Sequence, residues 1–461
     1  MKGDFTRDTF DAVDHFSRVL MQQGRVQLDA DWNEQVSILL HYVRTLAADL
    51  LGPGAGTASG FNIIPLAAPL TVPPTTPPTT DSKTVTNNFG IQAGHYYVDG
   101  ILCENDALCA FTGQSYKPDS LQYSDKLLVY LDVWELFVTA IDDKTIRESA
   151  LGGPDTAARA QVMWQVKVHG KEPGTNVALP ADFDRTKVNK YWDAWVKEWQ
   201  PDARGKLKAL VEKPEVNADP CIQSPDSKYR GHANQLYRIE IHRGGPVEEA
   251  TFKWSRDNGS VAAAWLQPEE DTSPNGILVS HTRGFEEGDW VELTHDDLEL
   301  MGEPGKLVKI AAVNGDVLLT EDRDHSGDAN AWNKNYKNPK VRRWNQSERG
   351  DVILVGDAIP IKSNGNQPIE LEDGLQVQFD YSAGTIYRSG DYWLIPARVA
   401  TGGIEWPRDA KNNAIAVPPH GVTHHYAPLA VIAVNAGGEV NVNDGDCRCV
   451  IEPPIICVPK P

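Results

Sequence analysis

Two short stretches of the sequence carry side chains that could hold a metal ion. In DRDHSGDANAWN, Asp322, Asp324 and Asn330 stand at positions 1, 3 and 9 of a twelve-residue loop, with Gly327 at position 6. This is the spacing of an EF-hand calcium loop. The last position is Asn333, which cannot supply the bidentate carboxylate that such a loop needs. An acidic loop between two strands is therefore the better interpretation, with these three oxygen-bearing residues as calcium candidates.

The second stretch is PPHGVTHHYAPLAVIAV, in which His420 and His424 share a face whether the chain is helical or extended. Such a pair could bind a transition metal. The neighbouring prolines favour an extended segment, and no carboxylate is adjacent, so histidines packed at the start of a strand are the simpler interpretation. Cys447 and Cys449 are too close together for a zinc knuckle, and with Cys457 further on no fourth ligand is evident, so the three indicate reduced thiols. We expect no resident cofactor.

Signatures of catalysis are missing from the sequence. It has no G-x-S-x-G elbow, no P-loop and no strand–GxGxxG–helix unit. The polar run FKWSRDNGS offers Arg256 and Asp257, which an enzyme would have to combine with a residue such as His424. A tight turn at Asp257-Asn258-Gly259 between two strands explains the same run more simply. The prediction is that the protein is not an enzyme.

Aromatic residues mark a helical insertion. Trp192, Trp195 and Trp199 follow one another at i, i+3 and i+7, so they lie on one face of a helix. Such a face could be a platform for a sugar, because aromatic rings present large apolar surfaces with a polar edge. The alternative, which we favour, is a helix that packs its tryptophan face on a sheet.

The stretch LMQQGRVQLDADWNEQVSILLHYVRTLAADLLG, residues 20–52, predicts a different kind of element. Arg25 is followed by Asp29 and Asp31, either of which could cap a helix that starts there. Apolar residues then recur at steps of three and four, until Gly52-Pro53-Gly54 ends the helix. A helix with such a stripe needs a surface to cover it, which is either the body of the chain or a partner.

Composition limits the class of protein. A length of 461 residues suggests about three domains. The net charge of −20 disfavours binding to nucleic acid or to anionic membranes. No signal-peptide pattern opens the sequence, and its most apolar stretch, Leu127 to Ile141, is too short to cross a bilayer. We expect a protein made in the cytosol, with no direct membrane insertion.

The predicted fold is mainly β, with an N-terminal helix, one helical insertion, and one or two small barrel- or sandwich-like β units. Strands are indicated by β-branched and aromatic runs, by the Asp99-Gly100 hairpin signal, and by Gly-Asp turns at Gly288, Gly315, Gly350 and Gly390. The expected divisions are an N-terminal hook and helix (1–68), a Pro/Thr linker (69–82), a first β domain (83–181), a Trp-rich helical insertion (182–228) and a second β region (229–461).

Several long motifs together carry a resemblance. They are MKGDFTRDTF, HFSRVLMQQGRVQLDADWNEQ, YLDVWELFVTAI, ALGGPDTAARAQVMWQVKV, NQLYRIEIHRGG, ATFKWSRDNGSV, FEEGDWVEL, GDYWLIPARVATGGIEWP and PPHGVTHHYAPLAVI. The set resembles an uncharacterised bacterial family whose genes often lie beside those of phage-tail-like contractile injection systems. The N-terminal part is also similar to phage-tail baseplate and fibre proteins, in which it looks like the piece that docks on the tail.

This resemblance implies a structural component at the baseplate of an injection particle or at its periphery. Its partners would be other subunits and copies of itself, and the particle could be released or associated with a cell surface. The residues expected to dock are Arg25, Asp31, Trp32, Val36, Leu39, Val43, Leu46 and Leu50. Two alternatives remain open, namely a carbohydrate- or surface-binding module on such a particle and an injected cargo or enzyme. The helix could instead fold back on the chain's own β domain.

Overall fold

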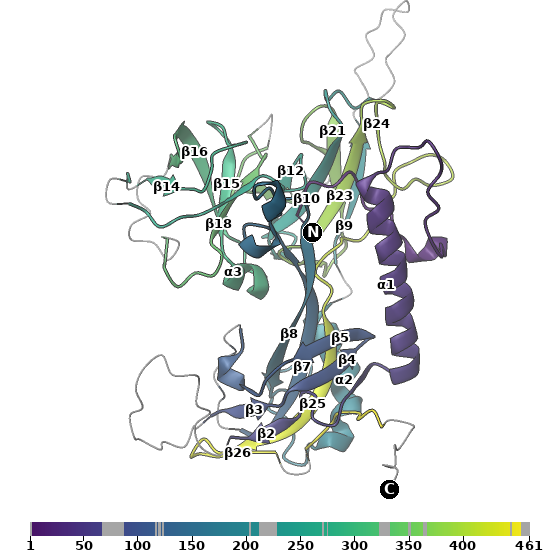
Figure 1. Cartoon of the computed structure of the whole chain (residues 1–461), viewed down its shortest axis with the longest axis vertical. Helices are drawn as coiled ribbons and strands as arrows, with labels where there is room; N and C mark the ends of the chain where they lie inside the picture. The colour runs from purple at the N-terminus through teal and green to yellow at the C-terminus, as the bar shows by residue number, and fades with distance from the viewer. Residues whose placement is uncertain are drawn as a thin grey trace, which may run out of the picture.

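The computed structural model describes residues 2–66, 87–115, 118, 121, 124–201, 204–211, 228–269, 272–273, 275–321, 332–348, 352–362, 367–442 and 445–452. Strands account for 38% and helices for 15%. The predicted fold class is confirmed, since curled β sheets make up the body, a long helix stands near the N-terminus, and one further helix is inserted between strands (Figure 1). The predicted linker 69–82 lies outside the described residues.

The first β unit combines three sheets around one core. Their strand orders are β1-β4-β5, β2-β3-β6 and β26-β25-β7-β8. The strands are β1 (Gly54–Gly56), β2 (Ile63–Pro65), β3 (Phe89–Ile91), β4 (Gly94–Val98), β5 (Ile101–Asn105), β6 (Cys109–Ala110), β7 (Ser124–Val138), β8 (Arg159–His169), β25 (His425–Val434) and β26 (Val440–Asn441). In β5 the residues alternate between buried and exposed, as expected for a strand with one face on the core. Phe61, Tyr96 and Leu131 are among the residues that fill this core.

The second β unit has sheets of order β19-β12-β10-β23-β24, β20-β21-β9 and β11-β22. Its strands are β9 (Lys206–Val211), β10 (Gln235–Arg243), β11 (Gly245–Pro246), β12 (Thr251–Ser255), β19 (Ile359–Pro360), β20 (Ile369–Glu370), β21 (Leu375–Asp380), β22 (Ile386–Tyr387), β23 (Tyr392–Arg398) and β24 (Gly403–Ile404). Tyr237, Trp254 and Trp393 are buried in its core.

The third β unit is a small curled sheet of order β13-β18-β15-β16-β17-β14. It consists of β13 (Ala262–Ala264), β14 (Gly276–Leu278), β15 (Trp290–Thr294), β16 (Lys306–Asn314), β17 (Val317–Thr320) and β18 (Lys340–Trp344), with the short helix α3 (Asp296–Met301) after β15. The sheet closes on itself next to its two edge strands, where Leu266 donates its N–H to Leu278 and Ser280 donates to Ala264.

The remaining helices flank these units. α1 (Asp29–Leu51) runs along one side of the molecule, and α2 (Val188–Trp199) packs beside β25 (Figure 1). Single 3-10 turns are η1 (Ala12–Asp14), η2 (Phe111–Gly113), η3 (Lys144–Ile146), η4 (Ser149–Leu151) and η5 (Arg185–Lys187). The predicted turn at Asp99-Gly100 joins β4 to β5, and both residues have a positive φ.

Strand pairing crosses two of the expected divisions. β25 comes from the range 229–461, yet it pairs with β7 and completes the first unit. β9 comes from the expected helical insertion 182–228, yet it pairs with β21 of the second unit. Both pairings join segments far apart in the sequence, so local patterns did not reveal them.

Candidate functional site

The N-terminus of α1 is fixed by side chains on the segment that precedes it. Asp29 accepts a hydrogen bond from the N–H of Thr6 at 2.8 Å. Burial tends to raise the pKa of Asp29, but the hydrogen bonds from Thr6 help to lower it. Asp31 accepts a longer bond, 3.4 Å, from the N–H of Leu28 just before the helix. Glu34 accepts a hydrogen bond from the hydroxyl of Thr9. The N-cap residue is Leu28, which has no side-chain cap, so the prediction that Asp29 or Asp31 is the capping residue is wrong; both lie inside the first turn and bond to Thr6 and Leu28. The predicted helix itself is confirmed.

One side of α1 is attached to the body of the chain. Ile38 and Ala30 are buried. Arg44 forms an ion pair with Glu135 of β7, and the backbone at Arg44 lies against Gly100 in the β4–β5 turn. On this side, therefore, α1 packs on the chain's own β domain, as the alternative prediction stated.

The other side of α1 is apolar and faces outward. Six of the expected docking residues have exposed fractions between 40% and 75%: Trp32, Val36, Leu39, Val43, Leu46 and Leu50. We call these six residues the α1 stripe. Leu40 and Tyr42 flank it and are also exposed. Scattered exposed apolar residues are normal on a protein surface, whereas an aligned apolar face of this length is a candidate interaction site.

A further apolar surface precedes the helix. Residues 11–28, which we call the N-terminal arm, expose the side chains of Val13, Phe16, Leu20, Met21, Val26 and Leu28. The arm is held to α1 through the N–H of Val19, which donates to the side chain of Gln35. Arg25 is exposed on this arm and turns the chain through a hydrogen bond from its N–H to Gln22. The arm and α1 lie together on one flank of the molecule (Figure 1).

The tryptophan helix packs inward. Trp195 is fully buried and donates its indole N–H to the carbonyl of Lys171. Trp199 stacks on Tyr130 of β7, with 4.2 Å between ring centroids, and Trp192 is partly buried against Trp199. The favoured interpretation, a helix that packs its tryptophan face on a sheet, therefore describes these three residues, and Trp195 has no surface to offer a ligand.

A cleft of about 1160 Å³ lies where the three β units meet. β10 supplies Arg238, Glu240 and His242 to its wall, on the strand face opposite the core residues Tyr237, Ile239 and Ile241. Both faces of β10 are buried. The charged face is buried because the third unit packs near it, and its ionic groups need partners there.

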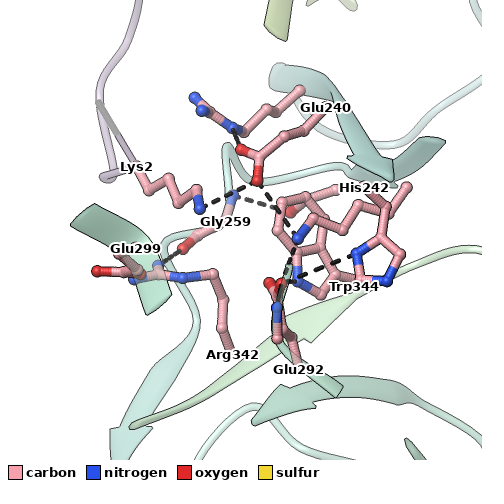
Figure 2. A network of polar contacts seen from close by, with 12 residues as sticks. Lys2, Glu240, His242, Gly259, Glu292, Glu299, Arg342 and Trp344 are labelled. Atoms are coloured by element: carbon pink, nitrogen blue, oxygen red, sulfur yellow. Dashed lines mark hydrogen bonds and ion pairs between the residues drawn. The ribbon is translucent and has the colours of Figure 1, made fainter. Parts of the chain in front are cut away.

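These partners form a network (Figure 2). The ammonium of Lys253 lies 2.5 Å from Glu292 and 3.3 Å from Glu240. Glu240 also pairs with Lys2 at 3.1 Å and with Arg238 at 2.6 Å. The second carboxylate oxygen of Glu292 accepts the indole N–H of Trp344 at 2.9 Å. The network joins β10 and β12 of the second unit to β15 and β18 of the third.

Burial and charge shift the pKa values in the network. Burial by itself raises the pKa of Glu292, but the ammonium groups of Lys253 and Lys2 outweigh it and lower this pKa to about 2. Burial, reinforced by Lys253, lowers the pKa of His242 to about 4. Glu292 is therefore ionised and His242 neutral near pH 7. The sequence analysis missed all of these residues, although the alternation of apolar and charged residues in QLYRIEIHR marks the strand that carries three of them.

A second polar cluster lies elsewhere on the cleft wall. The buried carboxylate of Asp132 contacts Nδ1 of His424 and the ammonium of Lys167, both at 2.7 Å. Burial tends to raise the pKa of Asp132, yet these two partners lower it. A carboxylate that holds an imidazole can orient a general base. Here the same contact also fixes the start of β25 on β7.

The predicted metal candidates are not brought together. His420 lies against the ring of Tyr392 and exchanges backbone hydrogen bonds with it, whereas His424 is held by Asp132. In the part of the chain that the structure describes, no cluster of three or more His, Cys, Asp or Glu side chains could hold a metal ion. The calcium candidates Asp322, Asp324 and Asn330 fall outside that part, as does Cys457.

The residues considered for an enzyme site point to different partners. Arg256 pairs with Glu372, Asp257 pairs with Arg343, and His424 pairs with Asp132. His424 lines the cleft, and neither Arg256 nor Asp257 is among its lining residues. The tight turn predicted at Asp257-Asn258-Gly259 is confirmed, because Asn258 and Gly259 both have a positive φ.

Comparison with known families places the chain in one of them. Residues 1–181 and 198–455 match the family described as "Family of unknown function (DUF6519)", and the chain belongs to this family. The matched ranges leave out residues 182–197, which include Trp192 and Trp195. Neither a curated protein nor a solved structure matches the chain. Among the described residues, no helix has the length and apolar character that crossing a membrane requires.

Proposed function

We propose that this protein is a structural subunit that docks into a larger assembly through α1 and the N-terminal arm. The exposed α1 stripe carries the proposal. Its six side chains are apolar and aligned, and they belong to a helix whose other side is already held by the body of the chain. A stripe of this kind is covered in a stable arrangement by a partner surface.

The apolar area is large enough for docking. Full burial of a large apolar side chain contributes about 1.5–3 kcal/mol. From the exposed fractions of the six stripe residues, covering the stripe would contribute on the order of 5–10 kcal/mol. The exposed side chains of the arm would add to this. Association itself costs several kcal/mol, so the stripe and the arm together support a specific contact.

The rest of the chain supports the proposal as a body of three joined β units, on which α1 and the N-terminal arm are exposed. The buried ionic network joins the second and third units, and Lys340 of the third unit pairs with Asp142, which follows β7 of the first. The packed tryptophan helix offers no support for the sugar-binding alternative. The sequence resemblance supplies the kind of assembly, a phage-tail-like contractile injection particle, with this subunit at the baseplate or its periphery.

The test is whether the protein co-sediments with a particle, and whether this co-sedimentation requires the α1 stripe. The chain would carry a tag in the organism that encodes it, and particles would be separated from free protein by sedimentation. We expect the natural chain in the particle fraction, and a Leu39→Asp, Leu46→Asp variant in the free fraction. The control is Leu151→Asp, which changes an equally exposed leucine on η4. Natural protein found only in the free fraction would overturn the proposal.

A further inference from the structure

We propose that the α1 stripe is covered by α1 of a second copy of this chain, in a parallel two-stranded coiled coil. The inference rests on the proposed function in using the same helix face, and it adds the identity and orientation of the partner. It follows from the spacing and type of the stripe residues, from the charges beside them, and from the way the body holds α1.

The stripe follows a heptad pattern. From Trp32 to Leu50 its steps are four, three, four, three and four residues, which is the spacing of the a and d positions of a coiled coil. With Val36, Val43 and Leu50 at a, the d positions are Trp32, Leu39 and Leu46. Valine at a with leucine at d favours parallel two-stranded coils. No proline or glycine interrupts Asp29–Leu51, so the sequence contains no residue that would kink the helix along this seam.

The residues beside the stripe allow two copies to approach. The flanking g positions are Gln35, Tyr42 and Asp49, and the flanking e positions are Asn33, Leu40 and Ala47. Only Asp49 among these six carries a formal charge, in a chain whose net charge is −20. Two copies would therefore meet with little like-charge repulsion along the seam. Leu40 and Tyr42, both exposed, would widen the apolar contact.

The position of α1 leaves room for a second helix. Its contacts with the body involve Ile38 and Arg44. The segment before the helix contacts Asp29, Glu34 and Gln35, and none of these five residues belongs to the stripe. α1 runs along one flank of the molecule, with the N-terminal arm beside it (Figure 1). Its 23 residues span about 35 Å at 1.5 Å per residue. The two bodies of a parallel pair would lie on opposite sides of the coil.

The first experiment measures the mass of the purified full-length protein by sedimentation over a wide range of concentration. We expect a dimer, and we expect Leu39→Asp with Leu46→Asp to raise its dissociation constant roughly a hundred-fold or more. The matched control is Thr45→Asp, an exposed residue of α1 outside the stripe, which should leave the dimer intact. Circular dichroism checks that each variant is folded. A natural chain that stays monomeric, or a dimer that survives the stripe substitutions, would overturn the proposal.

The second experiment tests the orientation by oxidation of introduced cysteines. Cys449, the exposed cysteine among those described, is changed to serine, as are Cys221 and Cys457, which lie outside the described residues. In a parallel coil each d residue faces its own copy, so Leu46→Cys protein should form a cross-linked dimer by itself. In an antiparallel coil, Leu46→Cys would need a Val36→Cys partner, and this result would overturn the parallel arrangement. A monomeric chain that still sediments with particles would overturn the coiled coil alone. A stable dimer absent from particles would overturn the proposed function alone.

Discussion

Arg44 of α1 and Glu135 of β7 form a two-pronged ion pair, with 2.6 Å between Nη2 and Oε1 and 3.2 Å between Nη1 and Oε2. The pair joins the N-terminal helix to the longest strand of the first β unit. Because Arg44 lies outside the α1 stripe, the pair holds the helix with its apolar face turned away from the body. The orientation of the α1 stripe, the proposed docking surface, thus depends on a contact that is itself polar.

This pair should contribute modestly to stability. Both side chains are about one third exposed, so solvent screens their attraction, while the two-pronged geometry strengthens it. We expect a coupling free energy of about 1 kcal/mol from a double-mutant cycle of Arg44→Ala and Glu135→Ala, measured by urea unfolding. A coupling near zero would show that burial of Ile38 and Ala30 is enough to hold the helix.

Substitution of Gly100 by alanine should destabilise the protein more than the positive φ of its turn alone would cause. Its φ is +79°, and a Cβ there would lie 2.0 Å from the carbonyl oxygen of Arg44. Gly152 is the matched control, because its φ is +87° and a Cβ there meets nothing within 4 Å. We expect Gly152→Ala to cost roughly 1–2 kcal/mol from backbone strain. Gly100→Ala should cost roughly 1–3 kcal/mol more, from the forced shift of α1. Equal losses in thermal unfolding would contradict this close contact.

The buried network should depend strongly on Lys253, which neutralises Glu240 and Glu292 together. Lys253→Met keeps most of the side-chain volume but removes the charge, so two buried carboxylates lose their shared partner. We expect a loss of about 3–5 kcal/mol in the free energy of unfolding. Lys362→Met breaks an exposed pair with Glu248 and should leave stability almost unchanged, because solvent screens such a pair. A similar effect from both substitutions would mean that the network does not hold the units together.

Acid should destabilise the protein through His242. Its pKa is about 4 in the folded chain, against 6.5 as its ordinary value. As the pH falls through this window, the unfolded chain binds a proton that the folded chain does not, so stability falls with pH. We expect His242 to account for roughly 2–3 kcal/mol of the loss between pH 7 and pH 4.5. The pKa of Glu292 is lowered to about 2, so its own stabilising contribution is lost only below about pH 4.5.

The check is urea unfolding of the natural chain and of His242→Asn at both pH values. The variant cannot take up a proton at this position, so its stability should vary less with pH by the amount assigned to His242. Parallel pH profiles for the two proteins would contradict a buried neutral imidazole at this position.

Local patterns in the sequence were sufficient for the elements that depend on neighbouring residues. The three-and-four spacing from Val36 to Leu50 predicted α1, the pair Asp99-Gly100 predicted a hairpin, and Trp192, Trp195 and Trp199 predicted a helix with one packed face. In each case the signal and its physical cause lie within about one helical turn or one β turn.

The cleft could not be predicted in the same way. In QLYRIEIHR the charged residues alternate with apolar ones, which is the pattern of a strand with one face in water. The structure buries Arg238, Glu240 and His242 because another unit, formed by later residues, packs near that face. Likewise, nothing local shows that His425–Val434 returns to pair with β7. Long-range packing decides both features.

Substitutions of two tryptophans should distinguish the core of the protein from its proposed docking surface. Trp195 is fully buried and hydrogen-bonded through its indole, whereas Trp32 is 73% exposed at one end of the α1 stripe. Trp195→Ala leaves a large cavity beneath α2 and should lower the free energy of unfolding by about 3–5 kcal/mol. Trp32→Ala removes little burial within the chain, so at protein concentrations low enough to keep the chain monomeric we expect its unfolding free energy to stay within about 0.5 kcal/mol of the natural value. In sedimentation the same variant should associate more weakly, because Trp32 would be buried only in the assembly. If Trp32→Ala instead destabilised the isolated chain as much as Trp195→Ala, the stripe would belong to the chain's own core.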